Sequence, residues 1–412
     1  MLRKFLEKPS VVRKDFSIAF ILILNAFTWY FMTLLMINIV LSGLNVTYAQ
    51  NLLIWSAYSI ALIGSGIVGS ILSNKLSRLK FLYLWMILGV VTSLLPALLS
   101  SFTVIIVLIM SILFGVSFGL GMPSCLTYFA DCTRIENRGR MSGITLLITN
   151  LSAPLFAILF NMSNLVVNSM IFAMWRASGL IIFFLKPEEK ITSEIKRNTS
   201  FTSVFHNKSF FLYFIAWLMF SLIDRFEWPI LRHFFGDFYY LIFMIGPIIC
   251  SFSAFIAGLL SDWIGRKRVV LYGFVTLGIA YAIIGIAPAM LISWYFYLAI
   301  SSIATGILWV TFILILWGDL SQPGTREKYY AIGETPFFLS IIIELLSDPY
   351  VMLIPAISAF SLASFFLFLA VLPLLYAPET LPEKKIELRR LRKYVEKAKK
   401  VKEKYVEGGA EG

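Results

Sequence analysis

The stretch Gly258–Arg268 has the sequence Gly-Leu-Leu-Ser-Asp-Trp-Ile-Gly-Arg-Lys-Arg and lies between two long apolar runs. Its eleven residues include one acid, three bases and two glycines. A tight, charged loop that joins two apolar helices on the basic side of a membrane has this composition. The stretch therefore predicts two membrane-spanning helices with a charged turn between them.

An internal repeat relates two parts of the chain. Ser70–Lys80 aligns with Gly258–Arg268, and a second pattern, an acid followed seven residues later by arginine, also occurs twice. Both repeats have the same offset along the chain, and the aligned pairs are Asn74 with Asp262, Arg78 with Arg266, Asp131 with Asp319, and Arg138 with Arg326. Two motifs that share one offset indicate a duplicated half, which is common in transporters.

The composition is that of an integral membrane protein. Of the 412 residues, 59% are hydrophobic and 14% charged, whereas about a quarter of a soluble domain is charged. The mean hydropathy is +0.84. Helices span a membrane with about 20 apolar residues, and we expect twelve such spans, at 16–40, 51–73, 81–99, 103–128, 141–162, 165–185, 209–231, 239–261, 268–287, 291–317, 329–351 and 355–376.

The polar segment 186–208 is the longest interruption between the predicted spans. We expect it to be a cytoplasmic linker between an N-terminal six-helix half at 1–185 and a C-terminal six-helix half at 209–376. A basic cytoplasmic tail follows at 377–412. The predicted fold class is an all-α integral membrane protein with two pseudo-symmetric halves.

Lys and Arg are distributed unevenly. Of the 35, 32 lie in the N-terminal segment, the linker, the tail and alternate loops, whereas the loops near 45, 101, 163, 289 and 353 have none. The positive-inside rule then predicts a multi-pass protein of the cell membrane with both termini in the cytoplasm. The net charge of +12 reflects this orientation and not a nucleic-acid partner. We expect the basic tail to contact anionic lipid or, alternatively, a protein partner.

The stretch Gly258–Arg268 resembles the loop motif of the major facilitator superfamily, Gly-x-x-x-Asp-(Arg/Lys)-x-Gly-Arg-(Arg/Lys). In that family the loop motifs, the acid-x6-Arg motifs and a Pro-Glu-Thr-like end of the last span form salt bridges that hold the cytoplasmic face shut. The resemblance implies such a gate at Asn74, Arg78, Asp131, Arg138, Asp262, Arg266, Asp319, Arg326, Glu379 and, after span six, Glu188. The alternative role of these residues is to brace helix ends and fix topology.

The first copy of the loop motif departs from the family pattern. Asn74 replaces the acid and Ser77 replaces the second glycine. Asparagine can form a hydrogen bond but not an ion pair, so we expect the latch of the first half to be weaker than that of the second.

Span seven contains the densest group of charges within the predicted spans: Asp224, Arg225 and Glu227. Ionisable residues are costly in hydrocarbon and mark functional sites. One face of this helix contains, at helical spacing, Trp217, Ser221, Asp224 and Trp228. The resemblance places span seven along the central cavity, so that these residues and Arg225 are candidates for substrate binding. The alternative is a neutralised cluster that stabilises the helix.

Four acids within the spans are candidates for proton coupling: Asp224, Glu227, Glu334 and Glu344. An acid that is desolvated in a cavity can bind and release a proton during transport. We place Glu227 and Glu344 first among them.

Further substrate-binding candidates lie in other spans. Arg176, in span six, binds either a substrate anion or a buried partner. The remaining candidates either line a cavity or pack between helices: Asn25, Trp29, Asn150 and Trp309.

The motifs most resemble those of the sugar and metabolite–proton symport branches, which implies a proton-coupled secondary transporter. Gln occurs only at Gln50 and Gln322, and sugar binding needs side-chain amides, which argues against a sugar. The Gly-Pro-x-x-Gly-Gly element of drug–proton antiporters is incomplete around Pro154, which disfavours an exporter without excluding it. The arginines within the spans favour an anionic or zwitterionic metabolite.

Other classes of function lack support. The sequence contains no Walker loop, no metal-ligand spacing and no nucleophile–base pair, and its three cysteines have no histidine partners. We therefore expect no enzyme, no catalytic residues, no cofactor, no metal site and no disulfide. The expected partners are a small-molecule substrate, protons and lipid, with the chain as a monomer. A membrane sensor that does not transport is the alternative.

Overall fold

The computed structural model describes residues 13–99, 101–185, 200–236, 239–351 and 353–382. These residues form helices and loops, with no strand among them. Twelve of the helical segments are long and apolar enough to cross a membrane. The predicted all-α fold with twelve membrane spans is therefore confirmed over these ranges.

The first six spans are formed by α2 (Arg13–Ser42), α3 (Tyr48–Lys75), α4 (Arg78–Leu98), α5 (Val104–Gly119) with α6 (Met122–Cys132), α7 (Arg138–Met162), and α8 (Leu165–Ser178) with α9 (Ile181–Phe184). The short η1 (Ile135–Asn137) precedes α7, and α10 (Phe201–Phe205) lies in the predicted linker. The last six spans are formed by α11 (Lys208–Phe235), α12 (Tyr239–Ile264), α13 (Arg266–Ile286), α14 (Leu291–Trp309) with η3 (Val310–Leu316) and α15 (Trp317–Leu320), α16 (Arg326–Gly333) with α17 (Thr335–Val351), and α18 (Ala356–Leu369) with α19 (Val371–Tyr376).

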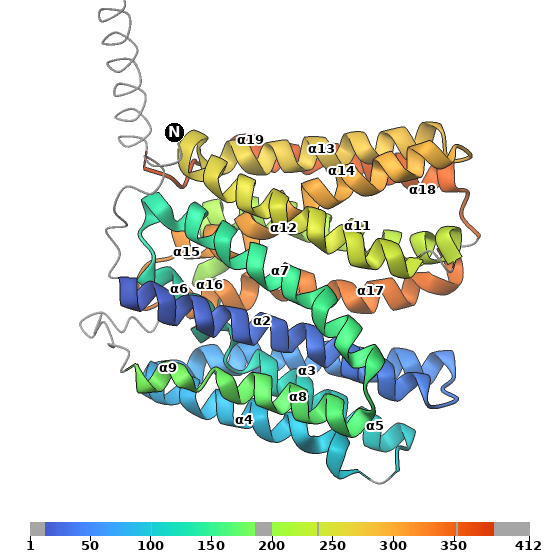
Figure 1. The fold of residues 1–412 in the computed structure, drawn as a ribbon. Coiled ribbons are helices and arrows are strands. Elements are labelled where there is room, and N and C mark those ends of the chain that lie inside the picture. The colour runs from blue at the N-terminus through green and yellow to red at the C-terminus, as the bar shows by residue number, and fades with distance from the viewer. Residues whose placement is uncertain (1–12, 100, 186–199, 237–238, 352, 383–412) are drawn as a thin grey trace, which may run out of the picture.

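The helices lie side by side along one common direction (Figure 1). Among the first six spans, α3 packs on α5 and α4 packs on α8. Among the last six, α12 packs on α14 and α13 packs on α18. The two sets meet mainly where α7 packs along α12 and where α3 packs along α17. Any movement of one set against the other must therefore change these two contacts.

Glycines explain how closely α7 and α12 approach. A Cβ atom added at Gly258 would lie 2.3 Å from the carbonyl oxygen of Gly139, and one added at Gly139 would lie 2.4 Å from that of Gly258. Such distances are far too short for a side chain, so the two backbones touch here. The first glycine of the loop motif is thus required by this helix crossing.

The charged loops lie at one end of the bundle, on the left in Figure 1. We call it the motif end, and it comprises the loops that follow α3, α6 and α12. The α2 helix begins there, since the ring of Phe16 lies 6.4 Å from that of Phe129 near the end of α6. The last described residues also lie there, because Glu379 accepts a hydrogen bond from the backbone of Arg266.

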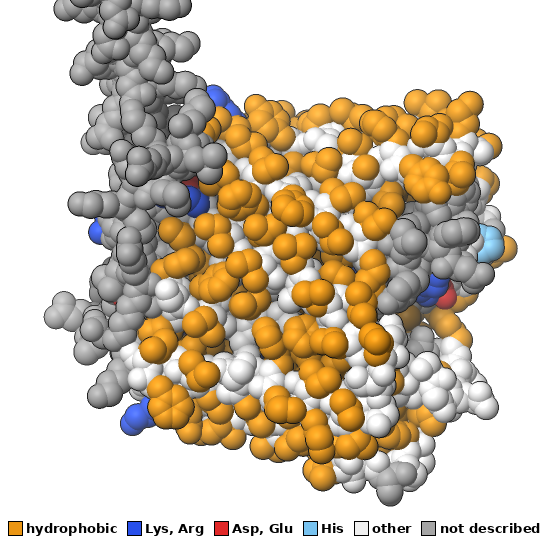
Figure 2. Space-filling view, viewed as in Figure 1, with side chains coloured by type: hydrophobic (Ala, Val, Ile, Leu, Met, Phe, Trp, Pro, Cys, Tyr) orange, Lys and Arg blue, Asp and Glu red, His pale blue; other side chains and the backbone are white. Residues whose placement is uncertain are grey.

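The outer surface of the bundle is apolar. Figure 2 shows hydrophobic side chains over most of the visible face, with the visible charged side chains near its two margins. Leu155 and Met174, for example, are 62% and 63% exposed. A continuous apolar surface of this extent would make a soluble protein aggregate, whereas it suits a protein surrounded by lipid.

Several spans contain an interruption of the regular α-helix, among them the fourth, the tenth and the eleventh. The fourth span is interrupted between α5 and α6, where Gly121 and Pro123 disturb the helix. The tenth contains the π-helical segment η3, a feature often found at functional sites. In the eleventh, the α-helix is interrupted at Glu334, between α16 and α17. The last two irregularities lie beside the central cavity described below.

Candidate functional site

Asp131, near the end of α6, binds two arginines at the motif end. Its Oδ2 atom accepts a hydrogen bond from Nη1 of Arg78 at 2.6 Å, and its Oδ1 atom accepts one from Arg326 at the start of α16. Arg78 begins α4, in the first set of helices, whereas Arg326 belongs to the second. One carboxylate therefore joins the two sets.

Asp319, in α15, forms the corresponding pair of contacts. It accepts a hydrogen bond from Arg138 at the start of α7, and its Oδ2 atom lies 3.3 Å from Nε of Arg266. The three side chains are almost completely buried, with at most 1% exposed. The two acids are thus held in the same way, each by an arginine from its own set and one from the other.

Asp262, at the end of α12, binds the first turn of α7. Its carboxylate accepts hydrogen bonds from the backbone N–H groups of Gly139, at 2.9 Å, and Arg140, at 2.8 Å. These N–H groups have no partner within the helix, and the helix dipole favours an anion at this position. Asp262 also accepts a hydrogen bond from Arg266 at 2.8 Å. A loop-motif acid of one set therefore caps a helix of the other.

Glu379 binds the first turn of α13 in a similar way. Its Oε1 atom accepts a hydrogen bond from the backbone N–H of Arg266 at 2.8 Å. Gly265, which precedes Arg266, has a φ of +105°. A Cβ atom added at Gly265 would lie 2.2 Å from Oε2 of Glu379. The second glycine of the loop motif thus provides both the backbone conformation and the space for this carboxylate.

A narrow cavity of about 20 Å³ lies in the middle of the bundle. Both sets of helices contribute to it, and most of its lining is aromatic: Phe27, Tyr30, Phe31, Phe118, Met122, Leu146, Asn150, Trp309, Ile313, Glu334, Phe337 and Phe338. The rings of Tyr30 and Phe338, one from each set, are 5.9 Å apart. A cavity of this volume holds about one water molecule, so the site is nearly closed in this conformation.

Glu334 is the only carboxylate, lysine, arginine or histidine among the described residues that line this cavity. It is 2% exposed, and its Oε1 atom has no hydrogen-bond partner among the described residues. The Tyr30 hydroxyl and the Trp309 indole N–H also have no hydrogen-bond partner among the described residues. Three residues of the lining therefore carry a polar atom that has no hydrogen-bond partner in the described part of the chain.

A charged cluster joins α11 to α17. Oε2 of Glu344 lies 3.3 Å from Nη1 of Arg225, and its Oε1 atom lies 3.2 Å from Nη2 of Arg232. The Arg225 guanidinium also lies 5.5 Å from the centre of the Phe337 ring and 5.7 Å from that of Trp228. Arg225 is thus held by Glu344 beside one of the rings that line the cavity.

Two further acids of α11 are buried near α13. Glu227 is 7% exposed and accepts a hydrogen bond from the hydroxyl of Tyr281, which is 1% exposed. Asp224, three residues earlier, is 8% exposed. A buried carboxyl bonded to a tyrosine can alternate between the protonated and ionised forms without losing its partner, because a hydroxyl can both donate and accept.

The sequence profile of the Major Facilitator Superfamily matches residues 18–226, which is more than half of the chain. This chain belongs to the major facilitator superfamily. A search of the curated proteins found no match.

Solved structures of the superfamily have the same fold. The human organic anion transporter MFSD10 is 16% identical, with a TM-score of 0.69 over 89% of this chain and 100% of that chain. The proton:xylose symporter XylE bound to 6-bromo-6-deoxy-D-glucose is 18% identical, with a TM-score of 0.67 over 89% and 96%. A double-tryptophan mutant of XylE is 16% identical, with a TM-score of 0.73 over 92% of this chain and 98% of that chain. At such identities the likeness concerns the fold alone.

The structure brings together eight of the ten residues that the superfamily motifs suggested for a gate: Arg78, Asp131, Arg138, Asp262, Arg266, Asp319, Arg326 and Glu379. The side chains of the other two are not described. Glu188 lies outside the described residues, and only the backbone of Asn74 is described, within α3.

Sequence reasoning missed Glu327, which belongs to the same network. Its Oε1 atom accepts a hydrogen bond from Nη2 of Arg78 at 2.6 Å, and its side chain is 2% exposed. Glu327 directly follows Arg326 and aligns with Gly139 at the offset that both repeats share. Two features of the sequence could have pointed to Glu327. The first loop motif lacks its acid, and an acid stands where the repeat has Gly139.

The predicted substrate-binding residues separate into three places. Asn150 and Trp309 line the central cavity. Trp217 and Ser221 are buried in α11, where the Trp217 ring stacks on Phe312 at 4.8 Å. Trp228 lies beside Arg225 in the same helix, so that α11 is the second place.

Asn25, Trp29 and Arg176 form the third place, between α2, α4 and α8. Nη1 of Arg176 donates a hydrogen bond to Oδ1 of Asn25 at 2.9 Å. The guanidinium lies 4.1 Å from the centre of the Trp85 ring and 5.1 Å from that of Trp29. Arg176 is fully buried and does not line the central cavity. Its Nε and Nη2 atoms have no hydrogen-bond partner among the described residues, so the contacts to Asn25 and the two rings hold the side chain in place without satisfying the whole guanidinium.

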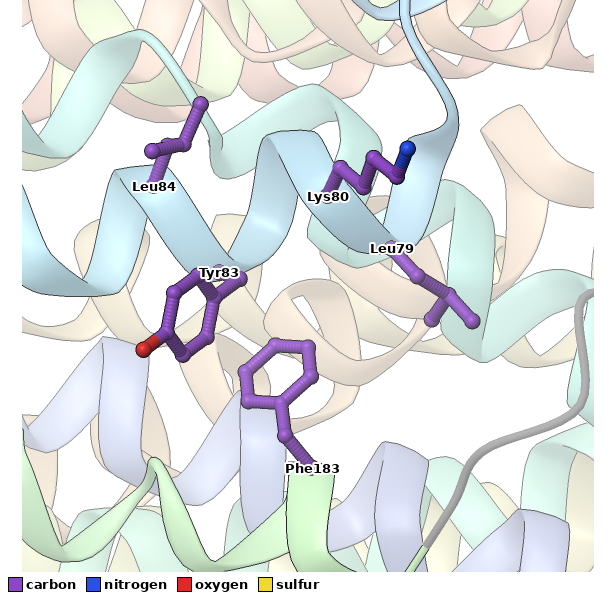
Figure 3. Close-up of a pocket in the computed structure, with 5 residues that line it drawn as sticks. All are labelled: Leu79, Lys80, Tyr83, Leu84 and Phe183. Carbon is purple, nitrogen blue, oxygen red and sulfur yellow. The ribbon is translucent and has the colours of Figure 1, made fainter.

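A second, open pocket of about 420 Å³ lies on the outer surface, between α4 and α9 (Figure 3). It is lined by Leu79, Lys80, Tyr83, Leu84 and Phe183. The rings of Tyr83 and Phe183 meet edge to face at 5.1 Å. Tyr83 and Leu84 are 43% and 56% exposed, so this pocket faces outward, unlike the central cavity.

Proposed function

We propose that this protein moves a small organic solute across the cell membrane by alternating access, driven by the proton gradient. The observation that carries this proposal is the pairing of Asp131 and Asp319, each with arginines from both sets of helices. These contacts close one end of a bundle whose centre contains a cavity lined from both sets. A closed end and a central cavity are what alternating access requires.

The ion-pair network at the motif end acts as the gate in this proposal. Opening that end separates Arg326 from Asp131 and Arg138 from Asp319. Pairs at the protein surface contribute about 1 kcal/mol or less each, and buried pairs cost more to break. Several together can bias two conformations that differ by a few kcal/mol. The charge distribution favours a cytoplasmic position for this end.

The moving bodies are the predicted halves at 1–185 and 209–376, with 186–208 as the linker. The direct contact of Gly139 with Gly258 supports this division, because a crossing of two backbones allows helices to slide or pivot without repacking large side chains.

Proton coupling is assigned to acids of α11 and of the eleventh span. Glu227, bonded to Tyr281, is the first choice. Glu344 is the second, and it would release Arg225 and Arg232 when it binds a proton. Asp224 and Glu334 complete the set, and both are buried.

Neither of the two arginines that favoured an anionic solute lines the central cavity. Arg176 is bonded to Asn25 away from the cavity, and Arg225 is bonded to Glu344. The solute class must therefore follow from the cavity itself. MFSD10 is an organic anion transporter and XylE a proton:xylose symporter, so the fold serves different solutes.

Export of lipophilic compounds is the second candidate function. The aromatic lining of the central cavity favours it, because rings bind apolar solutes of varied shape through contact area. It requires the same gate and the same proton coupling.

Uptake into proteoliposomes tests the proposal. A pooled panel of labelled organic acids, amines, amino acids and sugars is offered under an imposed pH gradient, with and without a protonophore. Accumulation that the protonophore abolishes is expected, and flux that merely equilibrates contradicts coupling. Absence of flux for every compound would favour a sensor over a transporter.

Glu227→Gln is expected to keep solute exchange but to lose accumulation, because the amide cannot carry the proton. Asp348→Asn, an acid-to-amide change near the outer end of α17, is the matched control and is expected to accumulate solute normally. Equal accumulation by Glu227→Gln and the unmodified protein would remove Glu227 from the coupling mechanism.

A further inference from the structure

We propose that the central cavity binds the cationic group of an organic ammonium compound between its aromatic rings, with Glu334 as the counter-ion. This inference rests on the proposed transport function and specifies its solute. It reverses the charge that the sequence favoured, because the arginines responsible for that expectation do not line the cavity.

The charge of the cavity wall supports a cation. Glu334 is the only described lining residue that is an acid or a base, and its Oε1 atom has no hydrogen-bond partner among the described residues. A buried carboxylate is stable only when a proton or a cation accompanies it. The arginine nearest to the lining rings, Arg225, is bonded to Glu344 and so cannot fill this role in the present arrangement.

The rings of the cavity provide the second half of a cation site. Phe337 and Phe338, which follow Glu334 within one turn of α17, are 5.4 Å apart, and Trp309 meets Phe337 at 5.7 Å. Tyr30 and Phe118, from the first set of helices, are 4.8 Å apart. The faces of aromatic rings attract cations, and cages of such rings recognise quaternary ammonium groups.

The cavity also carries free donors. Tyr30 and Trp309 line it, and neither the Tyr30 hydroxyl nor the Trp309 N–H has a partner among the described residues. They suit an acceptor atom elsewhere on the solute, such as an ether or carbonyl oxygen. The expected solute is therefore an aromatic or aliphatic ammonium compound, and the cavity must widen beyond about 20 Å³ to admit it.

Equilibrium binding to the purified full-length protein tests this inference with three probes of similar shape. Trimethyl(2-phenylethyl)ammonium has a permanent positive charge, (3,3-dimethylbutyl)benzene is its neutral carbon isostere, and 3-phenylpropionate is an anion. Calorimetric titration is expected to show the cation binding at least about tenfold more tightly than the other two. Equal or tighter binding of the neutral compound or the anion overturns the inference, as does no binding of the cation at millimolar concentration.

Variants of the cavity then assign the charge. Glu334→Gln is expected to weaken binding of the cation about tenfold, in line with the loss of a charge-assisted contact. Glu334→Asp keeps the charge and is expected to retain most of the affinity, which guards against a folding defect in the glutamine variant. Asp348→Asn is the control and is expected to bind like the unmodified protein. Unchanged affinity in Glu334→Gln contradicts the inference.

The transport proposal can fail separately. If the cation binds through Glu334 but no solute crosses the membrane, the site stands and the transport function falls. If an anion accumulates in proteoliposomes and Glu334→Gln leaves that accumulation unchanged, the transport function stands and the cation site falls.

Discussion

The two loop motifs hold equivalent arginines in place with acids from different sources. In the second motif, Arg266 bonds to Asp262 one turn earlier on its own side of the interface. In the first, Asn74 stands in place of that acid, and Arg78 bonds to Glu327 on α16, which belongs to the other set of helices. The comparison shows that a carboxylate absent from one side of an interface can be supplied from the opposite side.

The exchange alters what each loop does. Asp262 binds the backbone of α7 as well as Arg266, so the second loop is fixed both within its own set and across the interface. Arg78 bonds to Asp131 within its set and to Glu327 across the interface. Asn74 alone predicts a weaker ion-pair contact for the first loop motif than for the second. How much weaker that contact is depends on the contribution of Glu327 to the binding of Arg78.

The largest effect is expected where the pairs are most deeply buried. Asp319→Asn leaves Arg138 and Arg266 beside a neutral amide in a site with no solvent exposure, at a cost of about 3 kcal/mol. Asp131→Asn is the matched variant of the other half, and it is expected to cost about 1 kcal/mol because Asp131 is 18% exposed. Thermal unfolding of the two purified variants measures the difference, and equal losses would show that the two acids are equivalent.

A smaller effect is expected at the helix crossings. Gly258→Ala places a methyl group 2.3 Å from the backbone of α7 and is expected to destabilise the protein by about 2 kcal/mol. Ser70 occupies the aligned position of the first motif and already carries a side chain, so Ser70→Ala is expected to cost less than about 1 kcal/mol. The thermal unfolding midpoints of the two variants measure this difference. An unchanged midpoint in Gly258→Ala would mean that α7 and α12 can move apart at little cost.

The contribution of Glu327 is expected to be smaller still. Glu327→Gln removes one carboxylate partner of Arg78 and is expected to favour opening of the motif end by about 1 kcal/mol. Asn74→Asp in the same chain restores the acid of the first loop motif and should recover part of the loss. The measurement is the alkylation rate of a cysteine placed at the motif end. No change in that rate with Glu327→Gln would restrict Glu327 to a structural role.

Sequence reasoning predicted the parts that are encoded locally. Twelve apolar stretches specify twelve spans. The shared offset of the two repeats pointed to Asp131 and Asp319, and each of these acids forms ion pairs with arginines from both sets of helices. The loop motif also contains a glycine at 265, although the structural reason for it, φ of +105° beside Glu379, appears only in three dimensions.

The parts that the sequence did not predict depend on contacts between distant segments. Tyr281 lies 54 positions from Glu227, and nothing in either stretch marks them as a pair. Arg176 and Arg225 look alike in the sequence as charges within spans, yet one packs on Trp85 and the other bonds to Glu344. A buried charge is evident from hydropathy, but its partner is decided by the packing of helices.

We propose that the ion pairs of the motif end keep that end closed. Distances between spin labels in liposomes test it directly, with one label pair at Lys80 and Arg268 on the motif end and another at Ser101 and Met290 on the opposite end. The double variant Asp131→Asn, Asp319→Asn should shift the first pair toward longer distances and the second toward shorter ones. Unchanged distributions at both ends would contradict the claim.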